Sequence, residues 1–104
     1  MVSLPIFASN YSFLSDAPVS YFTTEDSKIL LAAQMDALNH YHDGTKVTWN
    51  NPKTGAHGTI IPSDSTKMNN LHCRKLTMNS FAQNRTGKAT FTYCKVDNVW
   101  KIKS

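Results

Sequence analysis

The residues of this chain that could do chemistry are its histidines and cysteines: His40, His42, His57, His72, Cys73 and Cys94. A metal site or a thiol nucleophile needs several such groups on one face. His40 and His42 are two residues apart in a predicted helix, so their side chains point about 200° apart. His72 and Cys73 are neighbours on a predicted strand and face opposite sides. The spacing predicts neither a metal site nor a cysteine–histidine pair, although a zinc site from His57, His72 and a cysteine is an open alternative.

The carboxylates give no sign of acid–base catalysis. They are Asp16, Glu25, Asp26, Asp36, Asp43, Asp64 and Asp97, and none lies on a predicted strand among apolar neighbours. Burial and a charged partner are what raise the pKa of a catalytic carboxyl group. The sequence also lacks a glycine-rich phosphate loop and the G-x-S-x-G and H-E-x-x-H motifs. We therefore predict a protein that is not an enzyme, with no catalytic residues, no cofactor and no metal.

A single helix precedes the strands that must carry the remaining candidates. Thr23 can cap its N-terminus, with Asp26 completing a capping box three residues later. Apolar residues then recur at helical spacing from Leu30 to Tyr41. Gly44 is placed to end the helix, after His40 and His42 in its last turn. The pattern predicts a helix over residues 24–42.

The chain changes to a period of two after Gly44, which is typical of strands. Val47 and Trp49 begin this pattern, and the Asn51–Gly55 segment has the proline and glycine of a tight turn. The predicted order is strand 58–61 ended by Pro62, polar loop 63–70, strand 71–80, turn 84–87, strand 88–96, turn 97–98 and strand 99–103. We expect an α+β domain over residues 23–104, with one N-terminal helix packed on an antiparallel sheet of four to five strands.

The first part of the chain, residues 1–22, shows no helical or strand period and is predicted to be extended. Its first ten residues resemble either the remnant of an export signal or an ordinary tail. No stretch reaches the roughly 18 apolar residues that a membrane-spanning helix needs.

The two cysteines lie on consecutive predicted strands. Cys73 and Cys94 face each other if the hairpin is centred between Gln83 and Asn84, close to the predicted turn. A disulfide there would close a loop of about 22 residues and contribute about 3 kcal/mol. Two buried free thiols in a cytosolic protein, or a redox-active pair, are the alternatives. We predict the disulfide, which is typical of a small exported domain.

The net charge of +4 raises a second class of function. A small basic domain that binds nucleic acid or another polyanion would gather its cations on one face. This alternative predicts that five residues converge: Arg74, Lys75, Arg85, Lys88 and Lys101. The chain has no run of five Lys or Arg and no RNA-binding aromatic motif, so nucleic acid is not the partner that we expect.

Several short motifs together resemble a known family. They are Thr23-Thr-Glu-Asp26, Trp49-Asn-Asn-Pro-x-Thr-Gly-x-x-Gly-Thr-Ile-x-Pro62, Cys73-Arg74, Cys94-Lys95-x-Asp97 and Trp100-Lys-Ile102. Over about residues 22–103 the chain is similar to the C-terminal domain of the bacterial 17-kDa surface antigen family. The resemblance implies an outer-membrane or surface-associated protein of a Gram-negative bacterium, without known catalytic residues. Members commonly carry a lipid-attachment cysteine and a glycine-rich segment ahead of this domain. This sequence shows neither, which favours a periplasmic or secreted form.

We therefore expect an exported, non-enzymatic cell-envelope domain with a structural or protein-interaction role. Its location would be the periplasm, the outer-membrane surface or the medium. Envelope proteins or membrane-associated components are the expected partners. The predicted contact surface comprises Trp49, His57, Arg74 and Lys75.

Overall fold

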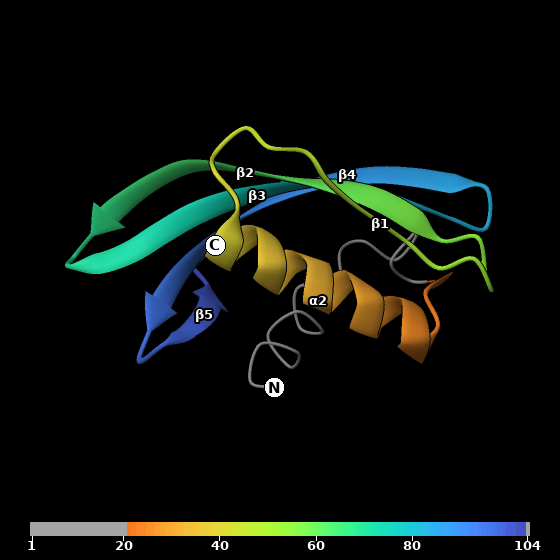
Figure 1. Cartoon of the computed structure of the whole chain (residues 1–104), viewed down its shortest axis with the longest axis horizontal. Helices are drawn as coiled ribbons and strands as arrows, with labels where there is room; N and C mark the ends of the chain where they lie inside the picture. Colours follow the sequence, from red (N-terminus) through yellow and green to blue (C-terminus); the bar gives the residue numbers. More distant parts are fainter. Residues whose placement is uncertain (1–20, 104) are drawn as a thin grey trace.

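One helix lies beneath a strongly curled antiparallel sheet (Figure 1). The computed structural model describes residues 21–103. Its elements are α2 (Thr24–His40), β1 (Val47–Asn50), β2 (His57–Met68), β3 (Leu71–Ala82), β4 (Arg85–Val96) and β5 (Val99–Ile102). The sheet has five strands in the order β1-β2-β3-β4-β5, so every strand pairs with its neighbour in sequence. This confirms the predicted α+β class. The extended segment predicted for residues 1–22 lies outside the described residues, apart from its last two.

The N-terminus of α2 is the predicted capping box. The Thr23 hydroxyl accepts from the Asp26 amide at 3.1 Å, and the Asp26 carboxylate accepts from the Thr23 amide at 2.8 Å. The C-terminal end was predicted wrongly, because the helix stops at His40 rather than at residue 42. Tyr41 already has extended dihedrals, and Gly44, with φ of 90°, belongs to the turn that follows.

The predictions of a strand that ends at Pro62 and of a polar loop over 63–70 are wrong, because β2 continues to Met68. The strand continues through Pro62, which pairs with Leu76, and then through an irregularity between Ser63 and Thr66. Proline removes one backbone donor and is tolerated in a strand only where no neighbour needs that donor. β1 pairs with β2 only as far as Ile60, so no strand needs the missing donor of Pro62, and the Gly44 amide of the turn after α2 donates to the Pro62 carbonyl there.

Two-residue turns join the last four strands. Asn69-Asn70, Gln83-Asn84 and Asp97-Asn98 all have positive φ at both positions, as type I′ hairpins require. The turn before β4 was predicted at residues 84–87 and lies earlier in the chain, at Gln83-Asn84. The hairpin centre inferred from the cysteines is therefore confirmed, and no bulge is needed between β3 and β4.

The core lies between α2 and the concave face of the sheet. Leu30, Ala37 and Leu38 from the helix pack with a buried layer from the strands that includes Ile60, Leu76, Phe91 and Tyr93. Trp49 is 6% exposed, and its ring contacts Phe22 edge to face at 5.4 Å between centroids. Its indole lies over Gly58 on the neighbouring strand, where a Cβ atom would stand 2.8 Å from the indole nitrogen.

Candidate functional site

Cys73 and Cys94 form a disulfide between β3 and β4. They are direct cross-strand partners, and their Cα atoms are 4.1 Å apart. This short separation marks a non-hydrogen-bonded pair of an antiparallel ladder. Both side chains are buried, at 1% and 6% exposed. The bond therefore fixes the register of the central hairpin and offers solvent no free thiol.

Arg74 closes the C-terminal end of α2. Its guanidinium donates to the carbonyl oxygens of Ala37, Leu38 and Tyr41 at 2.7–3.0 Å. A helix leaves its last carbonyls without partners, and here a side chain from β3 supplies the missing donors. This explains why the helix ends at His40 and not at the glycine.

The same guanidinium holds the turn after the helix. It donates to the Asp43 carboxylate at 2.8 Å and to the Ser65 hydroxyl at 2.7 Å. Asp43 also accepts from the backbone and side chain of Ser65. The hydrogen bond from Arg74, followed by those from Ser65, lowers the pKa of Asp43 from 3.8 to about 2. The cluster locks α2, the following turn and β2 to β3.

A second polar cluster joins the N-terminal end of α2 to the β1–β2 turn. Asp26 is 1% exposed and accepts from the Asn51 side-chain amide and from the Thr54 hydroxyl, each at 2.7 Å. Burial raises the pKa of Asp26, but the hydrogen bonds from Thr23, Thr54 and Asn51 outweigh it and leave that pKa below 3.8. The backbone carbonyl of Asn51 accepts from Gly55, whose φ of 83° suits glycine.

The four residues of the predicted contact surface divide between the two faces of the sheet. Trp49 is buried, and Arg74 is engaged at the end of the helix, both on the face toward α2. His57 and Lys75 are exposed. The His57 ring stacks on Phe81 with centroids 4.8 Å apart, and Lys75 lies 3.5 Å from the Asp64 carboxylate. The structure does not bring the four residues together.

The histidines are also separate from one another. Within residues 21–103, no three of the His, Cys, Asp and Glu side chains are grouped so that they could hold a metal ion. His72 and Cys73 do lie on opposite faces, since Cys73 is buried and His72 exposed.

The five cations of the polyanion alternative do not share a face. Arg74 and Lys75 are adjacent on β3 and point to opposite sides. Arg85 begins β4, whereas Lys101 pairs with Cys94 near the other end of that strand, about 30 Å away at 3.3 Å per residue. Arg85 instead lies over the ring of Tyr21 at 4.3 Å.

Sequence reasoning missed a groove beside the C-terminal end of α2. It has a volume of about 870 Å³. It lies between the C-terminal end of α2, the C-terminal ends of β2 and β4, and the N-terminal ends of β3 and β5. Lys67, His72, Lys95 and Trp100 line its sheet side. Only the register of four strands brings these residues together, so a linear motif could not reveal them.

The sequence matches the model of a known family over residues 36–101, which is more than half of the chain. That family is described as the 17 kDa outer membrane surface antigen. The chain belongs to this family. Two curated relatives, the 17 kDa surface antigens of Rickettsia bellii strain RML369-C and of Rickettsia bellii, are each 31% identical over 80 residues. The alignment covers 75% of this chain and 50% of each relative, so the chain spans about half the length of the proteins it matches. No solved structure matches.

Family membership supports the resemblance first seen in the Trp49–Pro62 and cysteine motifs. The structure gives several motif residues a role inside the domain. Asn51 and Thr54 bind the helix N-terminus, Gly58 makes room for Trp49, and Arg74 caps the helix C-terminus. Among the described residues, no helix is both long and apolar enough to cross a bilayer.

Proposed function

We propose that this surface-antigen domain acts without catalysis, as an exported structural or protein-binding module of the cell envelope. One observation carries the proposal: both cysteines and two strongly hydrogen-bonded charged side chains, Asp26 and Arg74, are bound to other parts of the domain. Cys73 and Cys94 are joined to each other, Arg74 caps the helix, and Asp26 holds the β1–β2 turn. Groups held in this way stabilise a fold and are not free to attack a substrate.

Export is supported by the disulfide and by the family. Disulfides persist in oxidising compartments such as the bacterial periplasm and are rare in the cytosol. A domain of this size has a stability of about 5–10 kcal/mol, so a cross-link worth about 3 kcal/mol is a large part of it.

The face of the sheet away from α2 is the surface we propose for protein contact. His57 and Lys75 lie on this face, together with Phe81 beneath the His57 ring. Most neighbouring residues are polar but uncharged, including Thr77 and Thr90, whose hydroxyls are 3.2 Å apart, and Lys88 is a charged residue beside His57 and Phe81. A partly apolar surface with few charges is typical of the centre of a protein–protein interface.

Two measurements test the proposal. The first is the mass of the protein taken from its own compartment, alkylated with and without prior reduction. Alkylation of both thiols only after reduction supports export, and alkylation without reduction contradicts it. The second places a photo-crosslinking amino acid at Phe81 or, as a control, at Lys28 on the exposed side of α2. Adducts with envelope proteins from position 81 alone support the contact face, and equal adducts from both positions contradict it.

A further inference from the structure

The groove at the end of α2 has one wall made by a row of side chains across four strands. Lys67 pairs with His72 between β2 and β3, and Lys95 pairs with Trp100 between β4 and β5. His72 and Lys95 directly flank the paired Cys73 and Cys94, so the two pairs belong to one row.

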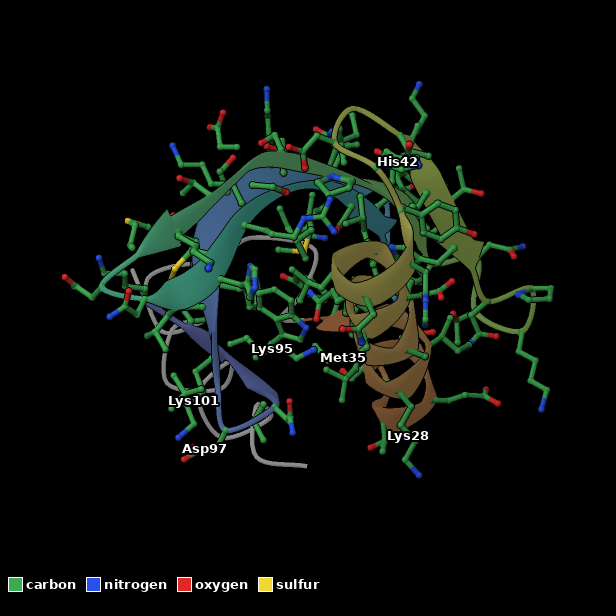
Figure 2. All side chains as sticks on the ribbon, turned by 60° about the vertical axis from the view of Figure 1, so that its left-hand side comes forward. Lys28, Met35, His42, Lys95, Asp97 and Lys101 are labelled. Atoms are coloured by element: carbon green, nitrogen blue, oxygen red, sulfur yellow. A yellow bond between two sulfur atoms is a disulfide. The ribbon has the colours of Figure 1, made fainter. Side chains whose placement is uncertain are left out.

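This row faces the helix side of the sheet. Arg74, two residues after His72, reaches the last turn of α2, so His72 points the same way. The Trp100 indole donates to Asn39 of α2 at 2.8 Å. Lys95, whose ammonium lies 5.5 Å from the Trp100 ring, is seen beneath the arch of the sheet between β5 and α2 (Figure 2). The opposite wall comes from Leu38, Asn39 and the turn after the helix.

The positive charges of this row are not neutralised within the described part of the chain. The ion pairs there are Lys53–Glu25, Arg74–Asp43 and Lys75–Asp64, and none includes Lys67 or Lys95. Lys67 on β2 and Lys95 on β4 lie on the same face of the sheet, two strands apart, where their like charges repel each other weakly. The Trp100 ring attracts the Lys95 ammonium, and a bound anion would offset the charge of both lysines.

The surroundings favour carboxylates over phosphate. The groove adjoins the C-terminal end of α2, where the backbone carbonyls carry partial negative charge. That partial charge disfavours every anion, but it disfavours a doubly charged phosphate more than a singly charged carboxylate. Leu38 and Trp100 also give the groove an apolar part that suits aliphatic side chains. Three strand spacings across the row make about 14 Å, the length of about four residues of extended chain.

We propose that this groove binds an acidic, partly apolar peptide segment of another envelope protein. The inference rests on the proposed binding role and adds the chemistry of the partner. Carboxylates of the segment pair with Lys67 and Lys95, and an aliphatic side chain contacts the small exposed edge of Trp100, which is 6% exposed.

The test uses the purified, disulfide-intact chain and a fluorescein-labelled octapeptide of alternating glutamate and leucine, followed by fluorescence anisotropy. The double variant Lys67→Gln/Lys95→Gln is expected to weaken binding at least about tenfold, since two charge-assisted contacts are lost. Lys101→Gln is the matched control. Lys101 is next to Trp100 but on the other face of β5, and in Figure 2 it lies apart from Lys95. This control is expected to change the affinity less than about twofold, as is usual for a surface charge outside the contact.

Three results would overturn the proposal. One is equal affinity for a peptide in which glutamine replaces glutamate, and another is equal weakening by Lys101→Gln and by the double variant. The third is displacement of the peptide by phosphatidylglycerol vesicles or single-stranded DNA at lower concentrations than by unlabelled peptide. Circular dichroism melting shows whether the variants are folded. Such a failure is distinct from failure of the proposed function, because neither the thiol measurement nor crosslinking from position 81 involves this groove.

Discussion

The side-chain amide of Asn51 donates a 2.7 Å hydrogen bond to the carboxylate of Asp26, and both residues are at most 2% exposed. The bond joins the first turn of α2 to the turn that connects β1 and β2. Asn51 also accepts from the Lys53 amide through its side-chain oxygen, so one residue shapes its own turn and fixes the helix to it. The orientation of the helix on the sheet therefore depends on a buried polar contact as well as on apolar packing.

Replacing Asn51 with alanine is expected to lower the free energy of unfolding by about 2–3 kcal/mol, because a buried carboxylate loses a donor. Urea unfolding followed by fluorescence measures this change. Asn50→Ala is the control, since Asn50 is the exposed neighbour on β1, and its effect should stay within about 0.5 kcal/mol. Equal effects of the two variants would show that the Asp26–Asn51 contact adds nothing to stability.

Acid is expected to destabilise the domain through Asp26 and Asp43. The pKa of each is below 3.8 in the folded state, and that of Asp43 is about 2. A carboxyl group with a lowered folded-state pKa stabilises the fold above its unfolded pKa, and the stabilisation disappears as pH falls through the folded value. The free energy of unfolding should therefore fall between about pH 4 and pH 2. Urea titrations in this range measure it, and Asp43→Asn should reduce the slope. An unchanged slope in that variant would argue against a role for Asp43.

Arg74→Lys is expected to cost about 2–3 kcal/mol despite the conserved charge. A lysine ammonium is a single point charge and cannot reach the carbonyls of Ala37, Leu38 and Tyr41 together with Asp43. Thermal or urea unfolding gives the change, and amide hydrogen exchange should rise in the last turn of α2. Lys75→Ala, on the other face of the same strand, is the control and should be nearly neutral. The prediction fails if lysine at position 74 keeps full stability.

Gly58→Ala is expected to destabilise the domain by about 1–3 kcal/mol through overpacking. The added Cβ would meet the backbone carbonyl of Asn79 and the Trp49 indole. Unfolding curves and a shift in Trp49 emission would report the displacement. Thr59→Ala serves as the control on the adjacent, half-buried position. A Gly58 variant as stable as the parent protein would mean that Trp49 moves without cost.

Reduction of Cys73–Cys94 is expected to lower the free energy of unfolding by about 3 kcal/mol, because the disulfide restricts the unfolded chain. The strand order should survive, since the Gln83-Asn84 turn sets the same register. Urea unfolding with and without reductant measures the stability, and circular dichroism follows the strands. Identical midpoints in both conditions would contradict the prediction.

Local features of the fold could be predicted from the sequence because neighbouring residues produce them. The capping box at Thr23 and Asp26 needs only four consecutive residues, and Asp97-Asn98 forms its turn from two. The sequence also predicted that Cys73 and Cys94 face each other, since paired residues in a hairpin have numbers with a constant sum. The C-terminal end of α2 could not be predicted, because the donors that cap its last carbonyls come from Arg74, which is distant in sequence.

The sequence by itself determined the α+β class, the family motifs and the pairing of the cysteines. Tertiary structure decided which charged groups are internal and which are available. Pro62 continues a strand only because β1 has already ended beside it. Arg74 is occupied at the end of the helix, whereas Lys67 and Lys95 share a groove without a carboxylate partner in the described chain. Such differences depend on strand register and on where the helix ends, and contacts between residues far apart in sequence set both.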